Sequence, residues 1–336
     1  MYLESYAFNR MPIRFSTYTR GTNVPDLPGN SLFHSTALFR VYEKTSGYRP
    51  IMLVAYDGDR PIAKMLAVIR KSVRWFPPSV IHRCVIYETC EFLDEQVDKN
   101  KLFSDMLNHL TKDVVSHSFL IEFRDLKQPL FGYKAFRENG YFPIRWMRVY
   151  NSLHSKKPEE RLSPSRKRQI SKALKAGVIT KVAETEEEVT EFVHMLKMNY
   201  SSKLLKHFPD LSFFKELGNQ KVSQEIQKLF IVKYKEKIIG GSVCLFSSGT
   251  SYLLFSGALR KRYKYYYPGV MAVWSAIKYA HEHGYQHFEF MYVGVPFRHY
   301  GFREFILRFG GKQSSTRRWY KFRWQWLNKI LTKFYI

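Results

Sequence analysis

The sequence has few cysteines, no long apolar run and no apparent secretion signal. Its 336 residues hold three cysteines, Cys84, Cys90 and Cys244, whose spacing fits neither a disulfide scaffold nor a metal site. No stretch of about 20 apolar residues is present, so we expect no membrane-spanning helix. Residues 1–10 lack a charged stretch followed by an apolar one, so no signal peptide is expected. These absences together predict a cytoplasmic protein.

Acidic residues are also scarce relative to basic ones. The chain has 29 Asp and Glu against 54 Lys and Arg, which gives a net charge of +25. A field of this size attracts phosphate groups, whether of nucleic acids, of nucleotide cofactors or of anionic lipid surfaces. Hydrophobic residues make up 45% of the chain, enough for extensive buried cores. The composition predicts a folded, basic protein with a phosphorylated partner.

One order of elements occurs twice along the chain. Each half contains a hairpin, a further strand, a helix, a strand, an aromatic turn and a final strand. The segment L-V-A-Y-D-G-D-R-P-I-A (53–63) corresponds to I-V-K-Y-K-E-K-I-I-G-G (231–241), and residues 139–142 correspond to the segment that ends at Gly311. This repetition predicts a duplicated α/β unit of about 150 residues with a mixed sheet. We place the N-terminal domain at 1–155 and the C-terminal domain at 156–336.

The C-terminal tail combines two patterns. Residues 317–323 alternate like a strand, and the chain from Trp324 onward has an apolar stripe at helical spacing with lysines beside it. That stripe comprises Trp326, Leu327, Ile330, Leu331 and Phe334. Such a helix is typical of an anchor that lies on an anionic membrane surface, while the alternative is a last helix packed on the core.

The loop 258–269 holds the strongest candidate binding site. Its cations can neutralise phosphates, its tyrosines can stack on a base or donate hydrogen bonds, and a helix begins directly after it. Gly269, after Pro268, would let a ligand approach the helix start. The candidate residues are Arg260, Lys261, Arg262, Lys264, Tyr267 and Gly269. The alternative is a basic turn that only aids solubility.

Three further groups of residues carry weaker signals. Glu289 lies mid-strand between Phe288 and Phe290, where its carboxylate could hold or deprotonate an amine; alternatively it pairs with a surface lysine. Arg166 and Arg168 belong to a basic helix that fits a tRNA or a lipid phosphate, or is merely a solvated face. The histidines at 281, 283 and 287 do not share one helix face, so no metal site is expected.

Several segments resemble the Fem-type aminoacyltransferases, a family with the fold of the Gcn5-related N-acetyltransferases (GNAT). They are W-M-R-V-Y-N (146–151), R-K-R-Q-I-S-K-A-L-K-A-G-V (166–178), I-I-G-G-S (238–242), Y-Y-P-G-V (266–270) and F-I-L-R-F-G-G (305–311). The resemblance implies two tandem GNAT-like domains. It also implies transfer of an acyl or aminoacyl group to an amine, often that of a lipid-linked precursor of cell-wall peptidoglycan, with aminoacyl-tRNA as donor and no tightly bound cofactor.

The resemblance places acceptor-side residues at Tyr292, His299, Tyr300 and Arg303. Together with Glu289, Tyr300 and Arg303 are the catalytic candidates; Tyr300 would protonate a leaving group or hold a phosphate, or else only cap a turn. The glycine signature that holds coenzyme A in simple acetyltransferases is absent from the loop 258–269, which argues against a simple acetyl-coenzyme A enzyme.

Two other functions remain open from the sequence. One is an N-acyltransferase that uses acyl-coenzyme A or an acyl carrier protein and makes an acylated amino acid or lipid. The other is a nucleic-acid-binding protein without enzymatic activity. A lipid-linked acceptor would add peripheral contact with the inner face of the membrane through the tail.

Overall fold

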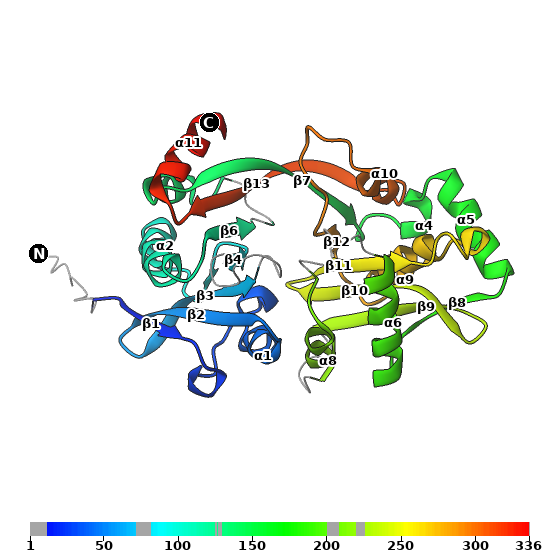
Figure 1. The fold of residues 1–336 in the computed structure, drawn as a ribbon, viewed down its shortest axis with the longest axis horizontal. Helices are drawn as coiled ribbons and strands as arrows, with labels where there is room; N and C mark the ends of the chain where they lie inside the picture. Colours follow the sequence, from blue (N-terminus) through cyan, green and yellow to red (C-terminus); the bar gives the residue numbers. More distant parts are fainter. Residues whose placement is uncertain are drawn as a thin grey trace, which may run out of the picture.

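A computed structural model describes residues 12–71, 82–124, 126, 130–199, 208–219 and 226–335. The residues on which the expectation about a signal peptide rests lie outside these ranges. The described residues form two α/β halves joined by one continuous mixed sheet (Figure 1).

The sheet follows the order β1-β2-β3-β4-β6-β13-β7-β12-β11-β10-β9-β8, and β5 pairs with β3. The strand bounds are β1 Arg14–Tyr18, β2 Tyr48–Asp57, β3 Arg60–Lys71, β4 His82–Tyr87, β5 Glu91–Phe92, β6 Leu120–Arg124, β7 Phe142–Ser152, β8 Val178–Val182, β9 Gln227–Tyr234, β10 Lys237–Ser247, β11 Thr250–Ala258, β12 His287–Phe290 and β13 Lys312–Phe322.

Helices cover both halves of this sheet. Their bounds are α1 Thr36–Lys44, α2 Lys99–Val115, α3 Tyr133–Glu138, α4 Pro158–Arg161, α5 Pro164–Lys175, α6 Glu186–Asn199, α8 Leu211–Asn219, α9 Pro268–Glu282, α10 Gly301–Leu307 and α11 Gln325–Tyr335, with 3₁₀ turns η1 Gly21–Asn23, η2 Leu32–His34 and η3 Lys264–Tyr266.

The predicted repetition is confirmed. The first half runs β2-β3-β4-α2-β6-α3-β7 and the second runs β9-β10-β11-α9-β12-α10-β13. In each half the strand after the long helix pairs in parallel with the strand before it, β6 with β4 and β12 with β11. The predicted mixed α/β fold with two GNAT-like units is therefore present, whereas the division of the chain at residue 155 stays a prediction.

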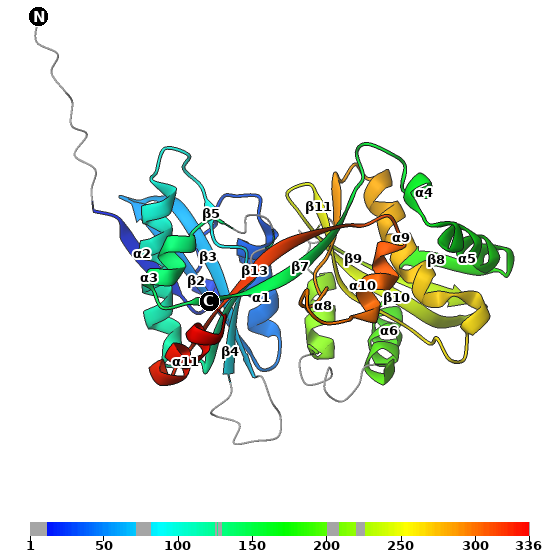
Figure 2. The same ribbon diagram turned by 90° about the horizontal axis from the view of Figure 1, so that it is seen from above.

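The two halves exchange their last strands. β13, from the end of the chain, lies between β6 and β7, and β7 pairs with β12 of the second half. Both strands cross from one half to the other in Figures 1 and 2. On β13, Trp319 is fully buried and stacks on Phe136 of α3, with ring centroids 4.6 Å apart. The core of the first half is thus completed by the end of the chain.

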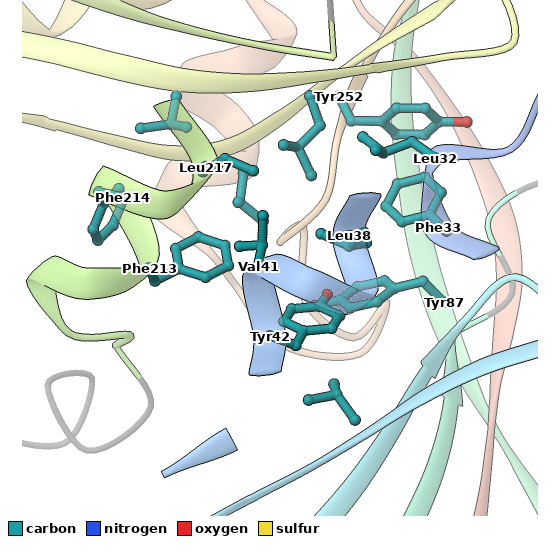
Figure 3. Packing of buried hydrophobic residues seen from close by; sticks show 14 of the residues in the cluster. Leu32, Phe33, Leu38, Val41, Tyr42, Tyr87, Phe213, Phe214, Leu217 and Tyr252 are labelled. Carbon is teal, nitrogen blue, oxygen red and sulfur yellow. The ribbon is translucent and has the colours of Figure 1, made fainter. Parts of the chain in front are cut away.

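A hydrophobic core also joins the halves on one side of the sheet. Tyr42 of α1 stacks on Phe213 of α8, and Phe33 contacts Tyr252 of β11 edge to face at 5.0 Å (Figure 3). These residues come from both halves and are buried. Burial of such aromatic surface stabilises the contact between the halves.

The first helix begins later than its apolar pattern predicts. The sequence predicts a helix over 31–42, but α1 starts at Thr36 and residues 32–34 form a 3₁₀ turn. Ser35 causes the break because its hydroxyl accepts a hydrogen bond from the Leu38 N–H at 3.1 Å, as an N-cap does.

The predicted strand and helix of the tail are both present, as β13 and α11. Asn328 fixes α11 to the sheet, since its side chain accepts from the Phe322 N–H at 3.2 Å and donates to the Gly140 carbonyl. Trp326, Ile330 and Phe334, spaced four residues apart, are exposed along one face of the helix. No helix among the described residues is long and apolar enough to cross a membrane.

Candidate active site

A cavity of about 1010 Å³, called the main cavity below, lies where β11 separates from β12. The two strands pair only from Thr250 to Leu253 of β11, although β11 continues to Ala258. One wall of the cavity is the segment from Leu253 to Arg262, and the opposite wall comes from the first half and β13. On the side away from β10, the backbone of β11 beyond Leu253 therefore borders the cavity instead of β12.

The cations of the predicted phosphate loop lie at the mouth of this cavity. Arg260, Lys261 and Arg262 line it and are exposed. Within the described ranges none of the three pairs with a carboxylate. Lys264 lies on η3, outside the cavity lining, with its ammonium over the Tyr265 ring. The loop thus presents three cations to an incoming anion.

The start of α9 lies directly behind Arg260. Tyr267 precedes the helix with a left-handed φ of 48°, and Pro268 occupies its first turn. A Cβ at Gly269 would lie 3.3 Å from Arg260 Nε, so the glycine lets the guanidinium lie against the helix end. The positive end of the helix dipole and Arg260 therefore act on the same space.

Tyr292, just after β12, lines the cavity opposite the loop. Its hydroxyl is 3.4 Å from Arg124 Nη1 and 3.4 Å from the Tyr87 hydroxyl. Burial raises the pKa of Tyr292, but Arg124 and Arg70 outweigh it and bring the pKa below its ordinary value. The pKa of Tyr87, in contrast, is raised by burial. Tyr292 is thus the tyrosine of this pair that is more readily ionised.

Tyr300, before α10, also lines the cavity, and burial raises the pKa of its phenol. Two neighbours predicted with it lie elsewhere. Arg303 donates to the Val295 carbonyl at 2.8 Å and to the Arg298 carbonyl at 2.7 Å, so it holds the loop before Tyr300. His299 is exposed and pairs with Glu304 at 2.6 Å. A protonated phenol at Tyr300 can donate a hydrogen bond into the cavity.

Glu289 lies apart from the main cavity, beside a small one of about 20 Å³. Its carboxylate accepts hydrogen bonds from both Nε and Nη2 of Arg148 on β7. Glu289 is only 4% exposed. The carboxylate is therefore already held by a partner, and this partner is a half-buried arginine rather than a surface lysine.

The two arginines predicted on α5 differ in their surroundings. Arg166 is buried, donates to the Phe305 carbonyl at 2.9 Å and lies over the Phe305 ring, so it binds α5 to α10. Burial, Arg308 and Arg260 lower the pKa of Arg166 to about 10. Arg168 is exposed on α5, as are Lys167 and Lys172. Of the two candidates, Arg168 is accessible to a large ligand.

The first-half wall holds charged residues that the sequence analysis missed. Arg70, Arg83, Arg124 and Arg318 line the cavity, and the buried Glu122 lies among them. The available signal was the strand L-I-E-F-R (120–124), in which Glu122 and Arg124 alternate with two apolar residues of a buried strand. No group of side chains suited to hold a metal ion occurs in the part of the chain that the structure describes.

The comparisons with known proteins agree with this fold. Residues 165–299 match the model of the acetyltransferase (GNAT) domain. A crystal structure of FemX superposes with a TM-score of 0.61 at 14% identity, over 96% of this chain and 99% of that one. A tandem GNAT protein from the clavulanic acid biosynthesis pathway has a TM-score of 0.58 at 8% identity, over 93% and 99%. L-PGS from Bacillus licheniformis has a TM-score of 0.56 at 11% identity, over 88% and 92%. No curated protein sequence matches the chain significantly.

Proposed function

We propose that this chain, which has the tandem GNAT fold, is an acyltransferase that transfers an acyl or aminoacyl group from a phosphorylated donor to an amine in the main cavity. The observation that carries the proposal is the open end of β11, which leads past three exposed cations to the start of α9. A donor phosphate would lie against Arg260 and the helix end. Its acyl group would then extend along β11.

The chemistry needs a proton acceptor and a proton donor. The amine nitrogen attacks the acyl carbon, a C–N bond forms, and the bond from that carbon to the donor sulfur or oxygen breaks. We assign Tyr292 to accept the amine proton and Tyr300 to protonate the departing group, since both line the cavity and their pKa values are shifted in opposite directions. Glu289 and Arg303 act as positioning residues in this scheme.

Two donors fit the loop, and different observations favour each. The exposed cations of α5 lie beside η3 and extend the basic surface beyond the cavity, which favours the long polyanion of an aminoacyl-tRNA. The GNAT domain match favours acyl-coenzyme A. In neither case does a cofactor stay bound.

Replacing Arg260 and Lys261 together by glutamine should raise the KM for the donor by roughly tenfold or more, because each change removes a charged hydrogen bond to phosphate. The kcat should change little. The assay offers aminoacyl-tRNA and acyl-coenzyme A separately, each with amine acceptors, over a range of salt concentrations. With tRNA the double variant should also lower the salt dependence of binding, by about one counterion per lost contact.

Lys278→Gln is the matched control, since Lys278 is exposed on α9, the helix that follows the loop, and pairs with Glu282 at 3.6 Å. An unchanged donor KM in the double variant would place the donor elsewhere. Absence of transfer from either donor would overturn the proposed function itself.

We further propose that α11 rests on an anionic membrane surface, as a lipid-linked acceptor would require. The side chains of Trp326 and Phe334 are 60% and 79% exposed, while Asn328 holds the opposite side of the helix against the sheet. Lys329 and Lys333 are exposed beside this stripe. An exposed apolar face flanked by lysines binds bilayers that carry anionic headgroups.

A variant with Trp326 and Phe334 replaced by serine should lose binding to phosphatidylglycerol vesicles by roughly tenfold or more, because two apolar side chains no longer enter the bilayer. Cosedimentation measures this. Leu174→Ser, which removes a side chain that is 55% exposed on α5, should bind like the unchanged protein. If all three proteins sediment equally with the vesicles, α11 does not bind the membrane and only packs on the core.

A further inference from the structure

Four arginines converge on the first-half wall of the main cavity, opposite the loop 260–262. Arg70 comes from β3, Arg83 from β4, Arg124 from β6 and Arg318 from β13. Their strands follow one another in the sheet. The positive charge of this wall therefore comes from the first half of the chain and from its last strand, β13.

The sheet register places these cations in two like-charged pairs. Arg70 is directly opposite Arg83, and Arg124 is directly opposite Arg318. Like charges directly opposite on neighbouring strands destabilise a sheet. Two such pairs on adjoining strands therefore require negative charge nearby that offsets their repulsion.

Glu122 supplies only part of that compensation. Its carboxylate is 2.7 Å from Arg83 Nη2, 3.1 Å from Arg124 Nε and 2.9 Å from Arg318 Nη1. Arg70 forms no ion pair with a carboxylate among the described residues, and the groups that face it are Arg124 and the phenols of Tyr48, Tyr87 and Tyr292. Among the described residues, three of the four guanidinium groups thus contact one carboxylate, and the fourth, that of Arg70, contacts none.

Two buried N–H groups at this wall also lack an acceptor. Arg83 Nε and Trp146 Nε1 have no hydrogen-bond partner among the residues described, and both residues line the cavity. The Trp146 ring lies 3.8 Å from the Arg318 guanidinium carbon. A buried donor without a partner costs free energy unless a ligand or water accepts from it. The wall offers donors, positive charge and open volume at the same place.

We propose that this arginine cluster, defined by Arg70, Arg83, Arg124 and Arg318, binds an anionic group of the acceptor, so that the amine acceptor is a phosphate ester or a carboxylate. The inference rests on the proposed function, because it assigns the loop 260–262 to the donor and the opposite wall to the acceptor. Guanidinium groups suit both anions, since their N–H groups pair with two oxygens at once. The acceptor amine would then lie between the cluster and the donor, beside Tyr292.

The test is calorimetric titration of the full chain with inorganic phosphate and, separately, with citrate, at constant ionic strength. Arg70→Gln should weaken binding at the cluster by roughly tenfold or more, because a charged hydrogen bond is lost. Arg70→Lys should retain part of it. The control Arg49→Gln removes an exposed arginine from the adjacent β2 and should bind like the unchanged protein.

The two ligands distinguish the two kinds of acceptor. Loss of phosphate binding alone in Arg70→Gln identifies a phosphate ester, and loss of citrate binding identifies a carboxylate. If Arg70→Gln does not fold, Arg83→Gln replaces it, because the Arg83 side chain is 21% exposed and tolerates change better. If the cluster variant binds both anions as tightly as Arg49→Gln does, the proposal is wrong.

A coenzyme A titration of the same variants separates this inference from the proposed function. Arg70→Gln should bind coenzyme A normally, whereas the double variant of Arg260 and Lys261 should not. If the double variant binds it normally while Arg70→Gln loses the small anion, the donor assignment fails and the arginine cluster stands.

Discussion

Replacing Glu122 by glutamine is expected to lower the free energy of unfolding by about 3–5 kcal/mol, the largest effect on stability that we predict. Glu122 is fully buried and contacts three guanidinium groups, and its carboxylate also accepts from the Tyr320 hydroxyl at 3.2 Å. Glutamine keeps the shape of the side chain but removes its charge. The three guanidinium groups, two of which (those of Arg124 and Arg318) are buried, then lack this counter-charge.

The effect should depend on pH in a defined direction. Burial alone would raise the pKa of Glu122, but Arg124, Arg318 and Arg83 together hold it well below its usual range. A carboxyl with a depressed pKa stabilises the fold fully above the pKa of the unfolded chain, about 4.3, and this contribution is lost as the pH falls below it. The difference between the two proteins should therefore shrink by about 1 kcal/mol between pH 7 and pH 3.5.

Urea denaturation at pH 7 and pH 3.5 measures the free energy of unfolding of the unchanged protein and of Glu122→Gln. Glu138→Gln is the control, because Glu138 is 57% exposed and its pair with Lys134 spans 3.8 Å. A surface pair of this kind contributes at most about 1 kcal/mol. Equal stabilities of the Glu122 and Glu138 variants at pH 7 would mean that solvent or a bound ion neutralises the arginines.

The Tyr292→Phe variant is expected to lose kcat by roughly 10²–10⁴-fold, the range for removal of a general acid or base. The donor KM should stay within a few fold, because the phenylalanine ring keeps the stacking on Phe255, whose centroid is 6.3 Å away. Only the hydroxyl that would accept the amine proton is removed. Initial rates at saturating donor and acceptor give both constants.

The pH profile gives an independent readout. A tyrosine acts as a base in its ionised form, so activity should rise with pH as Tyr292 loses its proton, and Arg124 and Arg70 bring that rise below the usual range of a phenol. In Tyr292→Phe this limb should disappear from the profile of kcat against pH.

Tyr87→Phe is the matched control. Tyr87 accepts from Arg124 at 2.8 Å and is buried beside Tyr292, but it is not part of the lining of the main cavity. Its loss should change kcat by no more than a few fold. Equal loss in both variants would mean that the tyrosines act only by holding Arg124.

Local patterns predicted the elements well. The hairpins around Asp57 and Glu236, the helix α5 with Ser163 before it, and the strand and helix of the tail all follow from turn residues, caps and periodicity within a short window. The exchange of β7 and β13 could not be predicted in this way. The pairing of Trp319 with residues near Pro143 depends on contacts far apart in the sequence, which no local pattern encodes.

The two walls of the main cavity also differ in how far the sequence alone could predict them. The donor loop could be found because Arg260, Lys261 and Arg262 are adjacent in the chain and precede a helix. The arginine cluster could not, because Arg70 and Arg318 are separated by most of the sequence. Only the order of strands in the sheet brings them to one wall.

The exchange of last strands also constrains how the chain is made. During synthesis β6 and β7 emerge early, but the strand that belongs between them, from Lys312 onward, emerges only after β8 to β12. The first half cannot close its sheet until β13 has been made, so its strand edges stay open for longer than in a protein whose domains fold one after the other. A nascent chain that stops before Lys312 should therefore need chaperones for its N-terminal half, because the strand between β6 and β7 is missing from it.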